Sequence, residues 1–111
     1  MREGKINVPH TDNDGNSTQD VISAAMLEMV AEFNGCSALD VKGAWKDDAG
    51  KLYVETLTQL VSAYEPSEAG DRALREIAVR AGLASKQLAV YVCYASGDVE
   101  IVNLVPLAKA A

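Results

Sequence analysis

The stretch from Ser37 to Tyr64, SALDVKGAWKDDAGKLYVETLTQLVSAY, predicts a β-hairpin. Its second arm, residues 52–64, is rich in the Val, Leu, Thr and Tyr that strands favour, and residues 37–45 form the matching first arm. The KDDAG run at 46–50 supplies the turn. Because this hairpin separates two segments that each contain a helix and a further strand, it decides how the sheet is ordered.

The residues before the hairpin predict a strand, a loop and a helix. Lys5–Pro9 alternates between polar and apolar residues and ends at a proline, which lacks the backbone donor that a strand needs. His10–Ser17 is dense in turn formers. Apolar residues then recur at helical spacing from Thr18 to Phe33, and Asn34-Gly35 supplies a C-terminal stop. The apolar positions that define this helix are Ile22, Met26, Met29 and Phe33.

The residues after the hairpin predict a second helix and two strands. Pro66-Ser67 can cap a helix over Glu68–Leu83. Gln87–Tyr94 is an uninterrupted apolar strand, and Val99–Leu104 is a fifth strand at a sheet edge. We expect residues 106–111 to form a flexible tail after a single domain at 1–105. The inward face of the second helix is expected to consist of Leu74, Ile77, Ala78 and Ala81.

This order of elements predicts an α+β fold, a ferredoxin-like β-α-β-β-α-β sandwich with an added C-terminal edge strand. In that topology the first four strands lie in the order 4-1-3-2, and both helices cover the same face of the sheet. The other face must then be polar or covered. We therefore expect a homodimer that self-associates through the helix-free face.

Charge and composition restrict the partners and the location. Of the 111 residues, 1–66 carry eleven Asp and Glu against five Lys and Arg, which accounts for the whole net charge of −6. Without a basic stripe, nucleic acid is excluded as a direct partner. The start of the chain has no apolar leader, and Glu28 and Glu32 interrupt the first helix, so we expect a cytoplasmic protein without a membrane partner. Cys36 and Cys93 lack metal-binding spacing and are expected to be buried thiols.

A candidate ligand-binding site follows from the predicted topology, which brings three connections to one end of the sheet. These are the loop after the first strand, the hairpin turn and the Ser85-Lys86 link before the fourth strand. The third strand is expected to lie beside the first, so that Glu55 approaches His10 and Asp12. The candidate residues are His10, Asp12, Asp14, Trp45, Asp47 and Glu55. Such a group could hold a metal or a polar ligand.

A simpler interpretation is open for each of these residues. Acidic residues are common in turns because Asp and Asn favour turn conformations, a lone His10 can merely hydrogen-bond its loop, and Trp45 can pack on the sheet. The DNDG run does not fit a calcium loop, because aligning its glycine places Val21 where a glutamate is required. Zinc would require more His or Cys than the chain contains. No metal ligand set is predicted, and the cofactor is unknown.

The hairpin also carries a resemblance. Its residues 43–55, GAWKDDAGKLYVE, together with VPHTDNDG at 8–15, are similar to small uncharacterised bacterial and mobile-element proteins that share a G-x-W-x-D-x-x-G-x-x-Y-x-E hairpin. The resemblance covers about the first two thirds of the chain. It implies no activity, but it singles out the same loop and hairpin as the topology does.

Three functions remain open from the sequence. The chain has no phosphate-binding glycine loop, nucleophile elbow, CxxC pair or dinucleotide fingerprint, which favours a non-enzymatic homodimeric module that binds a protein or a small polar ligand. The clustered titratable groups favour instead a small isomerase, lyase or hydrolase with His10 or Glu55 as proton carrier. The third function is a mobile-element accessory protein that sequesters a host factor.

Overall fold

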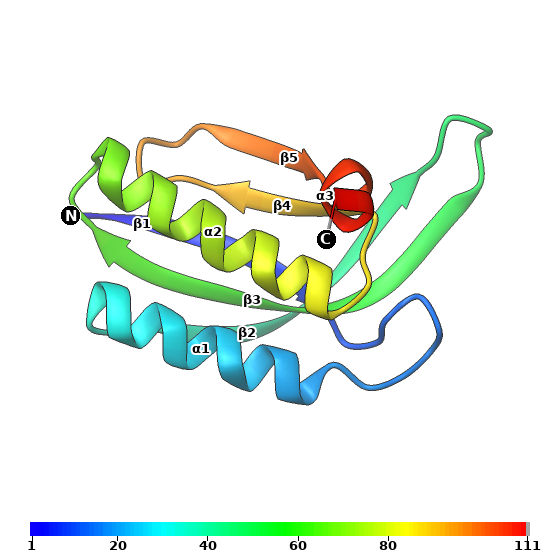
Figure 1. The fold of residues 1–111 in the computed structure, drawn as a ribbon, viewed down its shortest axis with the longest axis horizontal. Helices are drawn as coiled ribbons and strands as arrows, with labels where there is room; N and C mark the ends of the chain where they lie inside the picture. Colours follow the sequence, from blue (N-terminus) through cyan, green and yellow to red (C-terminus); the bar gives the residue numbers. More distant parts are fainter. Residues whose placement is uncertain (111) are drawn as a thin grey trace.

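The computed structural model describes residues 1–110, and the side chains of residues 1–108. A five-stranded antiparallel sheet is covered on one face by two long helices, and a short helix lies near the C-terminus (Figure 1). No helix in this part of the chain is long and apolar enough to cross a membrane. The elements are β1 Arg2–Pro9, α1 Gln19–Phe33, β2 Ser37–Lys46, β3 Leu52–Tyr64, α2 Glu68–Ala84, β4 Ala89–Cys93, β5 Val99–Asn103 and α3 Val105–Ala110.

The sheet has the strand order β2-β3-β1-β4-β5, and every neighbouring pair is antiparallel. The first four strands therefore lie in the predicted order, and β5 is added at the edge beside β4. This arrangement is α+β and is compatible with a ferredoxin-like fold. The bounds of β3 agree with the prediction, whereas β1 begins at Arg2 rather than at Lys5.

The core lies between the sheet and the two long helices. The inward face predicted for α2 is confirmed, since its four apolar residues are all buried. In α1, Ile22 and Met29 are buried as expected, but Met26 and Phe33 are only partly buried. The side of the sheet that faces the helices contributes Ile6, Val8, Leu60, Tyr64, Val90, Val92 and Val102.

Tyr64 joins three parts of this core. Its hydroxyl donates a hydrogen bond to Asp71 Oδ1 of α2 at 2.7 Å and accepts one from the backbone N–H of Ala95 at 3.0 Å. Its ring lies so close to Gly4 and Gly70 that a Cβ at these positions would come within 2.7 Å and 2.5 Å of ring atoms. Burial raises the pKa of Tyr64, so the phenol stays neutral and remains a donor.

Three turns share one backbone geometry. At 12–16, 47–51 and 94–98, the first residue donates its N–H to the carbonyl of the fifth, and the glycine in fourth place donates to the carbonyl of the first. These glycines, Gly15, Gly50 and Gly97, have φ values of 84°, 86° and 98°. Because side chains disfavour this region, glycine is what allows each turn to close.

Two observations concern the expectations about the outer parts of the chain. Most of the expected tail at 106–111 falls in the short helix α3, Val105–Ala110, and residue 111 lies outside the described residues. Leu104, directly before this helix, is fully buried, and Asn103 Oδ1 accepts a hydrogen bond from Val105 N at 3.1 Å. Pro106 suits this position, since proline is favoured in the first turn of a helix. Cys36 and Cys93, expected to be buried, are only half-buried.

Replacing Tyr64 by phenylalanine should lower the free energy of unfolding by about 1–3 kcal/mol, because Asp71 and the Ala95 N–H both lose their partner. Urea denaturation followed by circular dichroism would measure the loss. Tyr53→Phe is the matched control, since its hydroxyl bonds only Asp47 on an exposed segment and its removal should cost less than about 0.5 kcal/mol. Equal effects of the two substitutions would contradict the role given to Tyr64.

Candidate functional site

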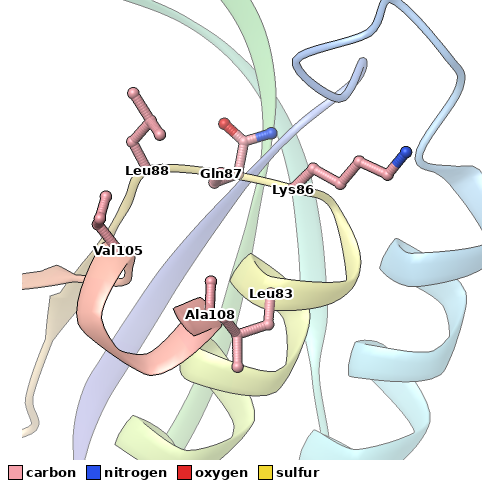
Figure 2. A pocket seen from close by; sticks show the side chains of 6 residues that line it. All are labelled: Leu83, Lys86, Gln87, Leu88, Val105 and Ala108. Atoms are coloured by element: carbon pink, nitrogen blue, oxygen red, sulfur yellow. The ribbon is translucent and has the colours of Figure 1, made fainter. Parts of the chain in front are cut away.

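A pocket of about 390 Å³ lies between α3 and the segment that joins α2 to β4 (Figure 2). Its walls are mostly apolar, and Lys86 and Gln87 supply the polar groups. The full lining is Leu83, Lys86, Gln87, Leu88, Val105 and Ala108. None of the sequence-predicted site residues lines this pocket, because its walls come from three segments without a shared motif.

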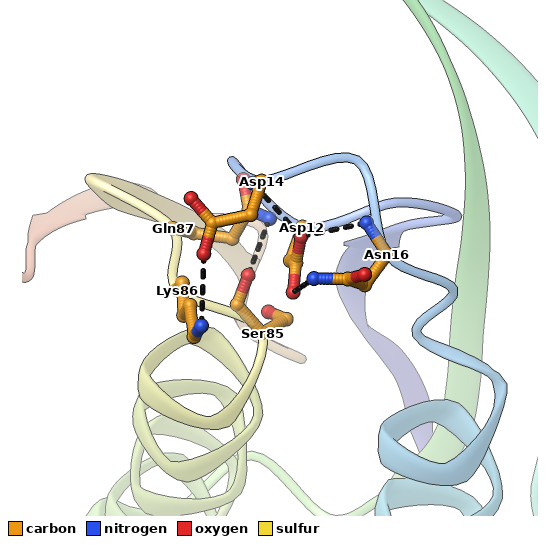
Figure 3. A network of polar contacts seen from close by, with 6 residues as sticks. All are labelled: Asp12, Asp14, Asn16, Ser85, Lys86 and Gln87. Atoms are coloured by element: carbon orange, nitrogen blue, oxygen red, sulfur yellow. Dashed lines mark hydrogen bonds and ion pairs between the residues drawn. The ribbon is translucent and has the colours of Figure 1, made fainter.

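The polar end of the pocket adjoins the loop after β1 (Figure 3). Lys86 Nζ pairs with Asp14 Oδ2 at 2.8 Å, and this carboxylate raises the pKa of the lysine. The side-chain nitrogen of Gln87 donates to the carbonyl of Thr11 at 3.4 Å and to that of Ser85 at 3.0 Å. Two of the three connections that we expected to meet are therefore in contact.

Asp12 shapes its own loop. Its Oδ1 accepts hydrogen bonds from the backbone N–H groups of Asp14 at 2.8 Å and Asn16 at 2.9 Å. The bond from Asn16 is the main reason that the pKa of Asp12 is lowered. Asp47 plays the same part in the hairpin turn, where its Oδ1 accepts from Ala49 N at 3.0 Å and Lys51 N at 2.9 Å. The turn-forming interpretation therefore suits both carboxylates.

His10 belongs to a polar cluster that the sequence hypothesis did not contain. Its Nε2 lies 2.8 Å from Thr58 Oγ1 and 3.3 Å from Asp40 Oδ1, and the Thr58 hydroxyl donates to the same carboxylate oxygen at 3.3 Å. Thr58 is buried at 5% exposure, whereas 76% of the Asp40 side chain is exposed. The cluster is therefore buried at Thr58, next to the sheet, and exposed to solvent at the Asp40 carboxylate.

The hydrogen bonds of Thr58 bear on which imidazole nitrogen is the donor. Because the Thr58 hydroxyl donates to Asp40, it accepts from His10, and Nε2 must carry the hydrogen. When the ring carries this single proton, the lone pair lies on Nδ1. In that singly protonated form, Nδ1 can accept a proton.

Trp45 and Asp47 do not join this cluster. Pairing between β1 and β3 ends where Pro9 faces Leu57, so residues 42–56 project beyond the sheet as a two-stranded arm (Figure 1). On this arm Trp45 stacks on Tyr53, with ring centroids 4.4 Å apart. Tyr53 lies four residues beyond Leu57, roughly 13 Å at the rise of a strand. The third connection, the hairpin turn, therefore lies away from the other two, because the strands that hold it are longer than β1.

The backbone around Glu55 lies near the end of β1, but the side chain of Glu55 points to the other face of the sheet. His10 N donates to the carbonyl of Thr56 at 3.0 Å, as neighbouring strands require. Side chains alternate between faces along a strand, so Glu55 shares a face with Leu57, while Thr58 and its partner His10 lie on the helix-covered face. The expected approach of the Glu55 carboxylate to His10 and Asp12 is therefore wrong.

No group of three or more His, Cys, Asp or Glu side chains within residues 1–108 is placed to hold a metal ion. The carboxylates that could have contributed are separated: Asp12 and Asp14 stay in the loop, Asp47 lies on the arm, and Glu55 faces the other side of the sheet.

Comparison with known proteins identifies a shared fold. No family model matches the chain, and no curated protein matches it. A solved phage SAM lyase in its apo state has a TM-score of 0.70 and 17% identity, over 91% of this chain and 87% of the other. A phage SAM lyase in complex with S-methyl-5'-thioadenosine has a TM-score of 0.71 and 17% identity, over 91% and 88% of the two chains. The chain thus has the fold of these two structures across nearly its whole length.

The pKa of Asp12 can be tested directly by NMR. The amide signals of Asp14 and Asn16 should titrate with a midpoint below 3.8, the ordinary value for this carboxyl, and Asp12→Asn should abolish the titration. The pKa of Asp12 is lower in the folded protein than in the unfolded chain. The ionised carboxylate therefore stabilises the loop above pH 3.8, and this stabilisation is lost as the pH falls through the pKa of the folded protein. A midpoint at or above 3.8 would contradict the role of Asp12 in closing its loop.

Proposed function

We propose that this chain is a small lyase that cleaves S-adenosylmethionine, working on a ferredoxin-like fold in the cytoplasm. The observation that supports it is the similarity in fold, with TM-scores of 0.70 and 0.71 to SAM lyase structures over 91% of the chain. This favours the enzyme among the functions left open by the sequence. At 17% identity the activity itself is the proposal.

The chemistry requires few catalytic groups. S-Methyl-5'-thioadenosine is the thioether that remains when the bond between the sulfur and the γ-carbon of the methionine chain breaks. The leaving group is neutral, because the sulfonium keeps the electron pair of that bond, and no general acid is needed. The lack of a nucleophile elbow or metal signature in the sequence is compatible with this reaction.

We assign a base to His10 Nδ1, because Nε2 lies within hydrogen-bond distance of Thr58, which donates to Asp40. In an elimination, Nδ1 takes a proton from the β-carbon, the electrons of that C–H bond form the double bond between the β- and γ-carbons, and the C–S electrons leave on sulfur. The products are the thioether and 2-aminobut-3-enoate. If the substrate's own carboxylate instead displaces the sulfur, a lactone forms and no base is needed.

Incubation of the purified chain with S-adenosylmethionine should release S-methyl-5'-thioadenosine, measured by liquid chromatography and mass spectrometry. His10→Gln should lower kcat by about a hundredfold or more if His10 is the base. Arg72→Gln, an exposed change on α2, serves as the control and should leave the rate unchanged.

The products of the reaction show which part of the proposal holds. A lactone product with an unaffected His10→Gln variant would remove the role of His10 but keep the lyase. No thioether from a homogeneous, folded preparation would overturn the proposed function, and it would favour the non-enzymatic module or the accessory protein that binds a host factor.

Self-association is part of this proposal, because the helix-free face of the sheet carries apolar side chains without a cover. Ile101 is 63% exposed and Leu39 is 51% exposed. Both lie on the face opposite to the one that carries the core residue Val102. A second copy of the chain would bury these groups.

Light scattering of the native chain should therefore show an oligomer, and Ile101→Lys should make it monomeric by placing a charge in the contact. Leu27→Lys is the matched control, since Leu27 is 71% exposed on helix α1 and should leave the mass unchanged. A monomeric native chain, or an equal response to both substitutions, would contradict the interface.

A further inference from the structure

The pocket beneath α3 has mostly apolar walls and polar groups at one edge. Leu83, Leu88, Val105 and Ala108 form its walls, and its volume of about 390 Å³ is near the lower end of the range of about 300–1,000 Å³ found for small-molecule sites. Figure 2 shows these side chains around one opening, with Gln87 at its edge. A small ligand with an apolar face and a polar group at its edge would complement these walls.

Gln87 presents a fixed acceptor at that edge. The partners show which side of the carboxamide is the nitrogen, since the carbonyls of Thr11 and Ser85 can only accept hydrogen bonds. The carboxamide oxygen consequently lies on the other side, and no hydrogen bond to it is recorded among the described residues. Figure 2 shows this oxygen turned toward the Leu88 side of the opening. A ring that carries an amino group would satisfy it.

The same residue links the pocket to the loop that carries His10. Gln87 bonds the carbonyl of Thr11, the residue after His10, and the adjacent Lys86 pairs with Asp14 of that loop. A ligand whose ring occupies the pocket would therefore extend its polar part toward the loop. A 5'-thioadenosine has this shape, with an amino-substituted flat base at one end and the sulfur at the other.

We propose that this pocket is the nucleobase subsite, in which the carboxamide oxygen of Gln87 accepts a hydrogen bond from the 6-amino group of adenine. The inference rests on the proposed function and makes Gln87 the residue that distinguishes adenine from hypoxanthine. A hypoxanthine ring places a carbonyl oxygen where adenine has its amino group, so two acceptors would face each other.

Titration of the ¹⁵N-labelled chain with S-methyl-5'-thioadenosine should shift the amide signals of residues 83–88 and 105–108. S-Methyl-5'-thioinosine should bind at least about tenfold more weakly. Ala108→Leu, which fills the pocket, should weaken binding of the adenosine compound by about tenfold or more. Ala44→Leu is the matched control on the exposed arm and should leave the affinity unchanged.

Gln87→Leu provides a second variant. It should weaken the adenosine compound about threefold to tenfold and remove most of the preference over the inosine compound. Unchanged melting temperatures would show that both variants fold. Equal affinity for the two nucleosides, signal shifts confined to other residues, or no effect of Ala108→Leu would each overturn the subsite.

Failure of this inference is distinguishable from failure of the proposed function. Release of the thioether from S-adenosylmethionine, with signal shifts away from 83–88 and 105–108, would retain the lyase and overturn the subsite. Binding at the pocket with the expected base preference, but without any cleavage, would retain the subsite and overturn the lyase.

Discussion

The pairing of β1 with β3 determines where the loop with His10 and the hairpin turn lie. The two strands run antiparallel from Arg2 opposite Tyr64 to Pro9 opposite Leu57, and β1 has 8 residues where β3 has 13. Because β1 ends first, the loop with His10 turns back over the helix-covered face, while the remainder of β3 continues with β2 as the arm. One difference in strand length thus separates the loop from the hairpin turn.

Around the end of β1, local polar contacts hold a small set of segments together. The His10 imidazole bonds side chains of β2 and β3, Asp12 closes the loop, and Asp14 reaches Lys86 after α2. Lys86 has a positive φ of 55° directly after the C-cap of α2, where Gln87 N donates to the carbonyl of Gly82 at 2.9 Å. The loop, the end of α2 and the pocket under α3 therefore form one connected region.

Much of the fold was predictable, because hydrophobic spacing and turn residues marked each long element and fixed the strand order. The pairing of Asp40 with Thr58 also follows from counting back along the hairpin from its turn, so the His10 cluster could have been found. The site hypothesis instead used strand direction alone, which places loops at one end but ignores strand length and side-chain alternation. The position of Trp45 was mispredicted because strand length was ignored, and that of Glu55 because side-chain alternation was ignored. The pocket could not be predicted, since its walls meet only in the packed structure.

The central claim is that the loop after β1 and the pocket under α3 serve one nucleoside ligand. A crystal structure of the chain with S-methyl-5'-thioadenosine tests it most directly. The account predicts the base under α3, its amino nitrogen within hydrogen-bond distance of the Gln87 carboxamide oxygen, and the sulfur directed toward the His10 loop. Ordered nucleoside bound at the arm or on the helix-free face, with the pocket empty, would contradict it.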